Sequence, residues 1–248
     1  MAEDNKMKIT FLGTGANGGT PQVDCRCVNC LSKNPKDKRL RSSFLLEEKN
    51  KTILVECGPD ARQQLLRQNL RLQDIDEITL THLHHDHAGG LIELASGKAW
   101  NKQLVIPGAI QAKLKRGHVG YLFSNGFIKF TTSRLISFFK VEHWIGEPCF
   151  GIQIGDKGKV VYSGDISEIS QSLLNRIKQT KLVIIDGTFL SESKKGHVSI
   201  KESCEVLKPL GKKVIFTHID HSQNRREIEK FLKPFGFQLA FDGMEVTV

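Results

Sequence analysis

Four side chains that could bind a metal ion lie within six positions of the chain: His82, His84, Asp86 and His87. The apolar run just before them predicts a strand over Ile75 to Thr81, and Ala88 to Ala95 predicts a helix. Because residues two apart in an extended chain point to the same side, His82 and His84 should face the same way. Imidazole and carboxylate groups suit zinc, manganese or iron, so the cluster predicts a metal site.

These ligands exceed what one ion needs, since a single metal ion takes three or four protein ligands. His85 is left out, because its side chain should point away from its neighbours. Further candidates each follow an apolar run, so the end of a predicted strand could bring each of them to a shared site. Taken singly, each could instead be an ordinary core or surface residue. They are His143, Asp165 and His218, and with them the sequence predicts a site for two metal ions.

Three cysteines form a second cluster, with the spacing C-x-C-x2-C: Cys25, Cys27 and Cys30. Three thiolates at this spacing can hold one zinc ion, which then needs a fourth ligand. The alternative is three free thiols in a surface loop, which would oxidise readily. We therefore expect a structural zinc that stabilises the loop at about residues 14–41. The remaining cysteines stand in apolar contexts and are predicted core residues, namely Cys57, Cys149 and Cys204.

Three further polar residues stand at predicted element ends. His197 directly precedes a helix predicted to begin at about Ile200, where it suits a general acid or an electrophile beside a phosphate group. The alternative for His197 is a surface histidine. Asp186 follows an apolar strand and could orient His197 or support a metal ligand. Glu56 ends another strand, where a carboxylate could orient a ligand histidine.

The elements that must position these residues run as strands and hairpins followed by helices, and the second half repeats that order. This pattern predicts an α/β fold with two mixed sheets packed face to face and helices outside. No composition shift marks a boundary, so we expect one domain over residues 1–248. The predicted strands include Met7–Leu12, Ser43–Leu46, Thr52–Val55, Leu135–Val141, Cys149–Ile154, Val160–Tyr162, Leu182–Ile185, Val214–Phe216, Gln238–Phe241 and Glu245–Val248, and the predicted helices include Asp60–Gln68, Gln171–Lys178, Ile200–Leu207 and Arg225–Leu232.

The charge balance narrows the class of partner. The chain has 36 Lys and Arg against 27 Asp and Glu, a formal net charge of +9. This excess favours small anionic substrates, nucleic acid or acidic membranes, and argues against a cationic substrate. We see no apolar run long enough to span a membrane, and the polar start Met1–Lys6 does not look like a secretory signal. The sequence predicts a cytoplasmic protein without a membrane partner.

The His-x-His-x-Asp-His spacing of residues 82–87 resembles the signature of the metallo-β-lactamase superfamily, and the later histidines and aspartate follow in that family's order. The resemblance implies an αββα sandwich with a dinuclear site. It assigns one metal ion to His82, His84 and His143, the other to Asp86, His87 and His218, and a bridging role to Asp165.

Gly13-Thr14-Gly15, the cysteine loop and Phe241–Glu245 resemble one branch of that superfamily, which contains phosphoribosyl 1,2-cyclic phosphate phosphodiesterases of the carbon–phosphorus lyase pathway. This resemblance implies that His221 completes the structural zinc site and that His197 serves the leaving group. The implied activity is metal-dependent hydrolysis of a small cyclic phosphodiester by a hydroxide between two manganese or zinc ions. Asp86 and His197 are the implied catalytic residues.

Three alternatives stay open. An RNase Z-like tRNA 3′-processing endonuclease fits the basic charge, but the chain has no long Gly/Pro-rich insertion to clamp tRNA, so nucleic acid is the less favoured partner. A non-hydrolytic relative similar to pyrroloquinoline quinone biosynthesis protein B would share the Gly-rich start and cysteine trio, yet such relatives have a degraded histidine motif. The third is a zinc-stabilised binding module with a vestigial site. The sequence leaves open the physiological substrate, the native catalytic metal, a homodimer, and the roles of residues 100–134 and of the basic stretch 33–41.

Overall fold

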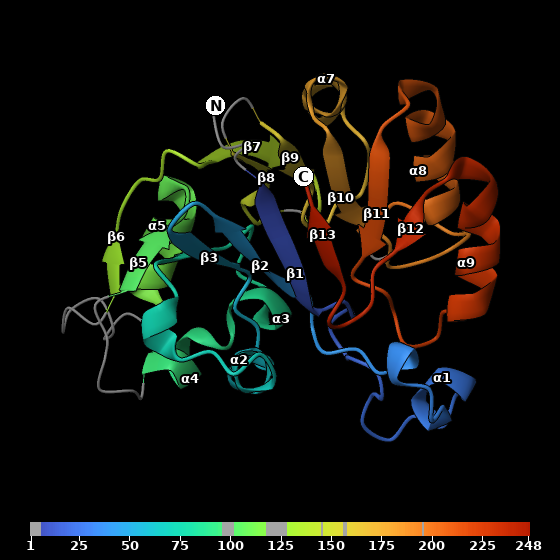
Figure 1. Cartoon of the computed structure of the whole chain (residues 1–248), viewed down its shortest axis with the longest axis horizontal. Coiled ribbons are helices and arrows are strands. Elements are labelled where there is room, and N and C mark those ends of the chain that lie inside the picture. Colours follow the sequence, from blue (N-terminus) through green and yellow to red (C-terminus); the bar gives the residue numbers. More distant parts are fainter. Residues whose placement is uncertain (1–5, 96–101, 118–127, 145, 156–157, 195) are drawn as a thin grey trace.

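The protein is described by a computed structural model that covers residues 6–95, 102–117, 128–144, 146–155, 158–194 and 196–248. Within these residues the chain forms two mixed β-sheets packed face to face, with helices on their outer faces (Figure 1). This is the αββα layering expected from the sequence, and the fold prediction is confirmed.

The first sheet has seven strands in the described residues, in the order β13-β1-β2-β3-β4-β5-β6. The strands β13, β1, β2 and β3 pair antiparallel, whereas β3 to β6 pair parallel. The last strand lies against the first, so the sheet joins the two ends of the chain (Figure 1). The bounds are β1 (Met7–Gly13), β2 (Ser43–Glu48), β3 (Lys51–Val55), β4 (Glu77–Thr79), β5 (Lys102–Val105), β6 (Ile128–Phe130) and β13 (Glu245–Thr247).

The second sheet has six strands in the described part of the chain, in the order β12-β11-β10-β9-β8-β7. An antiparallel meander of β7, β8 and β9 continues into the parallel strands β9 to β12. As a result β7, β9, β10 and β11 all end at the same edge of the sheet. The bounds are β7 (Ile136–Val141), β8 (Cys149–Ile154), β9 (Val160–Tyr162), β10 (Leu182–Asp186), β11 (Lys213–Thr217) and β12 (Gln238–Leu239).

Helices cover the outer face of each sheet (Figure 1). On the first sheet lie α2 (Ala61–Arg67), α4 (Leu91–Ala95) and α5 (Gly108–Arg116), and on the second lie α7 (Gln171–Gln179), α8 (Ile200–Leu207) and α9 (Arg225–Leu232). Side-chain caps fix where three of them begin: Ser170, Ser199 and Asn224 each accept a hydrogen bond from the first turn. Two short helices lie in loops, α1 (Val28–Leu31) and α3 (His85–Ala88).

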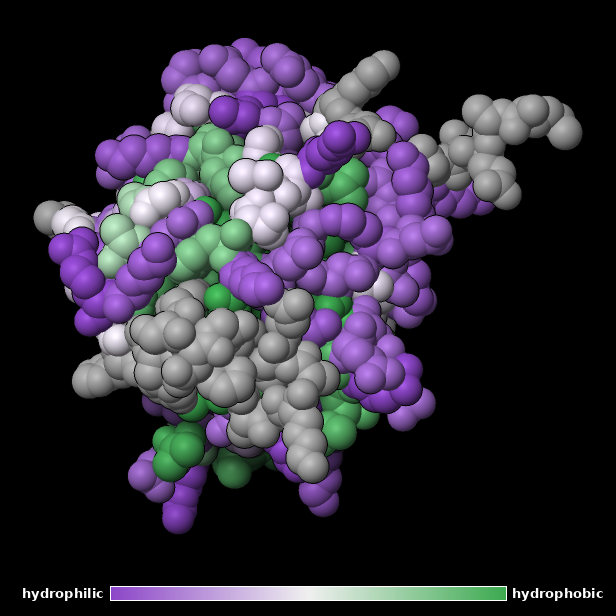
Figure 2. All heavy atoms as spheres, turned by 90° about the vertical axis from the view of Figure 1, so that its left-hand side faces the viewer, coloured by the Kyte–Doolittle hydropathy of each residue, from purple (hydrophilic) through white to green (hydrophobic). Residues whose placement is uncertain are grey.

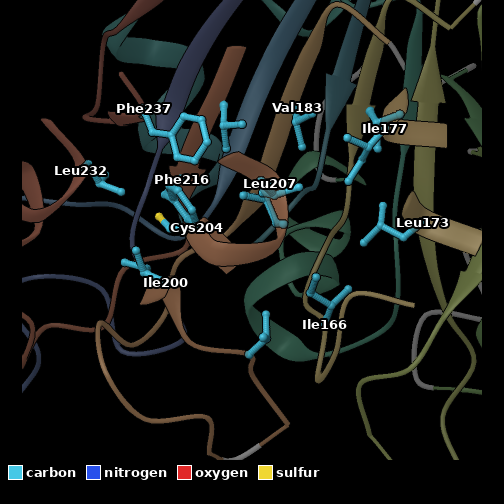
Figure 3. Close-up of a cluster of buried hydrophobic side chains, with 14 of the residues drawn as sticks. Ile166, Leu173, Ile177, Val183, Ile200, Cys204, Leu207, Phe216, Leu232 and Phe237 are labelled. Carbon is cyan, nitrogen blue, oxygen red and sulfur yellow. The ribbon is translucent and has the colours of Figure 1, made fainter. Parts of the chain in front are cut away.

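Three buried apolar clusters hold the layers together. The central cluster lies between the sheets and includes Phe11, Phe44 and Tyr162. The two outer clusters join each sheet to its helices. On the second sheet, Leu173 and Ile177 of α7 stand four residues apart and therefore share the face that packs inward (Figure 3). Full burial of such a side chain contributes about 1.5–3 kcal/mol to folding.

The structure changes the predicted helix Ala88–Ala95. The helix begins earlier, as α3 at His85, is interrupted at Gly89-Gly90 and resumes as α4 at Leu91. Gly90, at the interruption, packs against a distant segment: its N–H donates to the carbonyl of Cys57 at 2.8 Å, and a Cβ atom there would lie 2.0 Å from the carbonyl oxygen of Gly58. The predicted strand Ile75–Thr81 is paired only over Glu77–Thr79. Asp156 and Lys157, between the predicted strands Cys149–Ile154 and Val160–Tyr162, lie outside the described residues.

The surface on the side of the first sheet's helices shows hydrophilic side chains with apolar ones between them (Figure 2). Among the described residues, every helix is too short or too polar to span a bilayer.

Candidate metal centre

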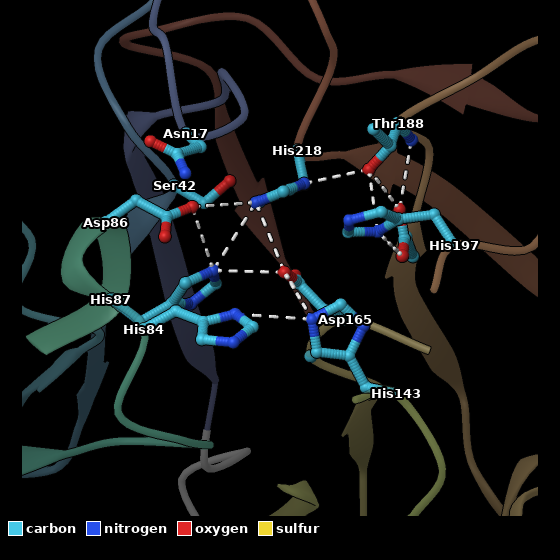
Figure 4. Close-up of polar contacts among 12 residues, drawn as sticks. Asn17, Ser42, His84, Asp86, His87, His143, Asp165, Thr188, His197 and His218 are labelled. Atoms are coloured by element: carbon cyan, nitrogen blue, oxygen red, sulfur yellow. Dashed lines mark hydrogen bonds and ion pairs between the residues drawn. The ribbon is translucent and has the colours of Figure 1, made fainter. Parts of the chain in front are cut away.

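The predicted ligands lie where strands of both sheets end. His143 follows β7, Asp165 follows β9 and His218 follows β11, all at the same edge of the second sheet. The histidine motif approaches this edge from the end of β4 (Figure 4). His218 has a φ of 62°, in the left-handed region that a non-glycine residue enters only at a cost of about 1–3 kcal/mol. The fold therefore holds this histidine in an unfavourable backbone conformation.

The first group of ligand atoms combines His82, His84, His143 and Asp165, and these atoms all lie within 4.8 Å of one another. Nε2 of His143 is 3.3 Å from Nδ1 of His84 and 3.7 Å from Oδ2 of Asp165. Nε2 of His82 is 3.8 Å from the same carboxylate oxygen. The structure thus brings together the three histidines that the resemblance assigns to one metal ion and the aspartate to which it gives a bridging role.

The second group combines Asp86, His87, Asp165 and His218, within the same 4.8 Å limit, and every member is buried. Nε2 of His218 lies 3.2 Å from Oδ2 of Asp86 and 3.4 Å from Oδ2 of Asp165. Nε2 of His87 lies 3.3 Å from Asp165 (Figure 4). Asp165 belongs to both groups, which is the position that a bridging carboxylate requires. His85 is exposed and belongs to neither group, as the sequence predicted.

Hydrogen bonds determine which ring nitrogen of His82 has a lone pair available to bind a metal ion. The hydroxyl of Thr81 donates to Oε1 of Glu56 at 2.5 Å, so its oxygen accepts from Nδ1–H of His82 at 2.9 Å. Nε2 of His82 then keeps its lone pair. Glu56 also forms an ion pair with Nδ1 of His87 at 3.3 Å, which is the supporting position expected for it. The sequence analysis did not single out Thr81, although it stands directly before the first ligand.

A second carboxylate supports the opposite side of the site in the same way. The hydroxyl of Thr188 donates to Oδ1 of Asp186 at 2.6 Å and accepts from Nδ1–H of His218 at 2.8 Å. The other oxygen of Asp186 accepts from Nδ1 of His197 at 2.7 Å. Asp186 therefore orients His197 directly and His218, a predicted metal ligand, through Thr188. Thr188 is the second supporting residue that the sequence analysis missed.

The buried atoms of the site fit divalent metal ions. Nε2 of His82 and Oδ1 of Asp165 are buried and have no hydrogen-bond partner in the described residues. Burial lowers the pKa of His87, but Asp165, Asp86 and Glu56 outweigh this effect and raise the pKa well above its usual value. The cluster thus carries a surplus of negative charge beside free imidazole nitrogens. Imidazole and carboxylate oxygen are the ligands that zinc and manganese take.

The cysteine cluster meets the predicted fourth ligand. Nδ1 of His221 lies 3.3 Å from Sγ of Cys25 and 3.6 Å from Sγ of both Cys27 and Cys30. Tetrahedral zinc with Zn–S of about 2.3 Å and Zn–N of about 2.0 Å places sulfur and nitrogen about 3.5 Å apart. The side-chain amide of Asn29 donates to the carbonyl of His221 at 2.8 Å, which holds the loop against this histidine. These four side chains could hold one zinc ion.

His197 faces the metal groups from beside His218, on which its ring is stacked with centroids 5.3 Å apart. Burial lowers the pKa of His197, but the Asp186 carboxylate raises it by more, to about 9. The imidazole is therefore protonated at neutral pH. Because Nδ1 donates to Asp186, Nε2 is the nitrogen left to serve a ligand in the cavity that His197 lines.

A cavity of about 400 Å³ opens over both metal groups. Among the described residues, its wall contains three carboxylates, from Asp86, Asp165 and Asp220, and neither lysine nor arginine. Trp144, whose side chain is about half exposed, and Phe189 provide aromatic surface. Five wall residues were not predicted from the sequence: Asn17, Gln22, Trp144, Phe189 and Asp220.

Comparisons with known proteins agree with this architecture. A family model described as "Beta-lactamase superfamily domain" matches residues 51–219. An octanoyltransferase of Porphyromonas gingivalis is 26% identical over 261 residues, which cover 98% of this chain and 52% of that protein. The chain thus spans about half the length of this relative, whose name describes the whole protein.

Two solved structures share the fold over nearly their full length. A structure described as a new diphosphatase from the PhnP family superposes with a TM-score of 0.84 at 26% identity, covering 98% of this chain and 97% of that one. Zinc-bound PqqB from Methylobacterium extorquens superposes with a TM-score of 0.83 at 20% identity, covering 97% and 100%. At that identity the PqqB structure supports the fold alone.

Proposed function

Because this chain belongs to the metallo-β-lactamase superfamily, we propose that it is a metal-dependent hydrolase of a small cyclic phosphodiester. The observation that carries the proposal is the pair of buried ligand groups that share Asp165. His197 stands beside them, protonated and facing the same cavity. A cavity of about 400 Å³ suits a small molecule.

The site would hold two divalent ions, manganese or zinc, on the ligands described above, and a structural zinc on the cysteine cluster. When bound, the two ions would supply positive charge beside the phosphoryl oxygens and lower the pKa of a water molecule that attacks phosphorus. The chain's own contribution is to place the ligands and to move a proton. Asp165 would be a ligand of both ions and Asp86 of one of them, while Glu56 and Asp186 orient the histidines.

His197 is the proposed general acid. As the bond from phosphorus to the leaving sugar oxygen breaks, Nε2–H of His197 would give its proton to that oxygen. Asp186, 2.7 Å from Nδ1, stabilises the imidazolium before the transfer and holds the ring in place. A proton donor of this kind contributes about 10²–10⁴-fold to the rate.

A diphosphate ester is the second candidate substrate, because the PhnP-family structure at 26% identity is described as a diphosphatase. The same site could serve both reactions. In each of them phosphorus is attacked and an oxygen leaves, as a sugar hydroxyl from a cyclic diester and as a phosphate from a diphosphate.

The test is a substrate screen with added manganese or zinc. It should include ribose 1,2-cyclic phosphate 5-phosphate, a 2′,3′-cyclic nucleotide, bis-p-nitrophenyl phosphate and a nucleoside diphosphate. We expect metal-dependent turnover that is highest for a cyclic diester, whereas highest turnover of the diphosphate favours the second candidate. A chain fully loaded with metal that hydrolyses none of them would overturn the proposal and favour a non-hydrolytic relative. A gel-shift with tRNA tests the RNase Z alternative, which predicts that the protein binds tRNA.

Repeating the screen with His197→Ala tests whether His197 is the general acid. The variant should lose about 10²–10⁴-fold on the cyclic nucleotide, whose leaving alkoxide needs a proton. It should lose far less on bis-p-nitrophenyl phosphate, because p-nitrophenolate leaves without protonation. The matched control is His85→Ala, which removes the exposed histidine of the same motif and should keep full activity on both substrates.

A further inference from the structure

One short segment of the chain carries a ligand of each proposed metal site. His218 belongs to the buried ligand group that contains Asp165, and His221 belongs to the cysteine cluster. The two histidines stand three residues apart, and we call residues 218–221 the linking segment. A change in how His221 is held can therefore reach the catalytic ligand through a very short stretch of backbone.

The linking segment is attached to the Gly-rich turn (residues 13–19) by a single bridge. The N–H of Ile219 donates to the carbonyl of Thr14 at 2.9 Å, and the carbonyl of Ile219 accepts from Ala16 at 3.0 Å. The bridge is isolated, so no ladder of further pairs continues it among the described residues. The turn leads into the cysteine loop and the linking segment leads to His221, so a zinc ion would join the two chains again just beyond the bridge.

His218 needs such an attachment because its backbone is in an unfavourable conformation. Its φ of 62° lies in the left-handed region, which a histidine keeps only where surrounding contacts hold it. On one side it is held by β11, which pairs with β10 and β12. On the other side it is held by the linking segment. Loosening that side would let the backbone relax and would move Nε2 from its position beside Asp86 and Asp165.

The cysteine loop (residues 21–38) cannot hold the linking segment by apolar packing. Only Asn29 and Cys30 of this loop are buried. Its helix α1 has four residues and projects from the two sheets (Figure 1). Three of its large apolar side chains are between 64% and 83% exposed, namely Val23, Val28 and Leu31. A segment without an apolar core depends on its metal ion, because the binding energy of the ion then serves as folding energy.

Asn29 connects the folded loop directly to the linking segment. Its side-chain amide donates to the carbonyl of His221 at 2.8 Å and to the carbonyl of Gln223 at 2.7 Å. Asn29 stands between two of the proposed zinc ligands, Cys27 and Cys30. Closing the cluster around a zinc ion would therefore fix the position of this amide and, with it, the end of the linking segment.

We propose that the cysteine site acts on the catalytic metal centre and not only on its own loop. With zinc bound, the cysteine cluster holds the linking segment in place, so His218 is ready to bind and the affinity of the catalytic centre for its metal ions rises. The cysteines and His221 are thus positioning residues of that centre. Linkage requires that metal in the catalytic centre strengthens zinc binding by the same factor, and such couplings are typically about 5–150-fold.

Manganese titration of the purified protein, followed by electron paramagnetic resonance of the free ion, measures the catalytic centre selectively, because manganese prefers carboxylate ligands to thiolates. The titration is made on metal-free wild-type protein and again after one equivalent of zinc, which thiolates select. We expect zinc to raise the manganese affinity by about 5–150-fold. An unchanged affinity would overturn the inference. A decrease would also overturn it, because zinc would then only compete for the catalytic ligands.

Two variants show where the zinc acts. Cys25→Ser removes a ligand that is far from the linking segment in sequence, and zinc should no longer raise the manganese affinity of this variant. The matched control is Val28→Ser, which changes an exposed side chain of the same loop and should respond to zinc like the wild type. An equal rise in Cys25→Ser would place the effect outside the cysteine site and contradict the inference.

Circular dichroism separates this coupling from a general effect on folding. The zinc-free wild type should keep the helix and strand content of the zinc-loaded protein, because the three apolar clusters contain no residue of the cysteine loop. A zinc-free chain that is unfolded throughout would refute the inference, since zinc would then act on the whole fold and not through His218. Because no turnover is measured, the outcome is independent of the proposed function.

Discussion

The hydroxyl of Thr188 accepts a hydrogen bond from Nδ1–H of His218 at 2.8 Å and donates one to Asp186, so it links this carboxylate to the histidine. Glu56, Thr81 and His82 repeat the arrangement on the other side of the site. In both places a carboxylate accepts from a threonine hydroxyl, and the hydroxyl accepts from a histidine. At each of the two proposed metal positions, a threonine hydroxyl therefore fixes the tautomer of one histidine ligand, His82 or His218.

Thr188→Val tests this support, because valine keeps the shape of threonine but cannot accept the hydrogen bond from His218. We expect metal affinity of the catalytic site to fall by about 10–100-fold. Titration of metal against a coloured chelator measures this directly. The matched control is Thr247→Val, at an exposed position of β13, which should bind metal like the wild type. Unchanged affinity in Thr188→Val would mean that the hydroxyl does not support the ligand.

Asp186→Asn tests the charge that keeps His197 protonated. The pKa of His197 is raised to about 9, so the acid form is present below that pH and is lost as the pH rises through it. Without the carboxylate the pKa should fall toward its usual value of about 6.5 or lower. In a plot of kcat against pH, the decline on the alkaline side (the alkaline limb) should then shift from about pH 9 to a lower pH. Glu192→Gln, at an exposed position in the loop between β10 and α8, should keep the wild-type profile. An unchanged alkaline limb in Asp186→Asn would exclude His197 as the acid.

Much of the site was predictable because its signals are local. The histidine motif occupies six consecutive positions, and strand ends that share one sheet edge bring in His143, Asp165 and His218. The supporting threonines were not predictable, since a threonine next to a histidine or an aspartate is common and its role depends on where the side chain points.

The break between α3 and α4 shows the same limit within the fold. Apolar spacing predicted one helix over Ala88–Ala95, because periodicity reports which face packs inward and not how closely two backbones approach. The contact of Gly90 with Gly58 is between segments more than 30 residues apart. A helix end that coincides with a contact to a distant segment cannot be predicted from the apolar spacing of the helix itself.

Cys27→Ser tests the structural zinc site. Burial raises the pKa of the Cys27 thiol, but hydrogen bonds from the backbone of Cys30 and from His221 lower it to about 6, so this sulfur is readily a thiolate. The variant should lose about one zinc per chain in elemental analysis, and its Tm should fall by on the order of 5 °C or more, as a loss of ~2 kcal/mol gives at this size. Cys204→Ala, in the core of α8, should keep the zinc. Equal zinc content in both variants would leave the cluster without a metal role.

Gly58→Ala tests how the metal loop is held. A Cβ atom at this position would lie 2.0 Å from the carbonyl oxygen of Asp86, so the backbone that carries this ligand must move. Overpacking of this kind costs about 1–3 kcal/mol of stability. A shift of about 1 Å in a reacting group also costs about 100-fold in rate, so we expect activity to fall by at least tenfold.

Gly108→Ala is the matched control, because a Cβ atom there would meet no heavy atom within 4 Å. Alanine also favours the helix that begins at this position, by about 0.5–1 kcal/mol, so the control should be at least as stable as the wild type. Thermal unfolding and metal-dependent turnover should be measured on both variants. If Gly58→Ala keeps the turnover of Gly108→Ala, the packing of Gly58 on Asp86 does not set the position of the ligand, and the histidine motif must be held by its own side-chain contacts alone.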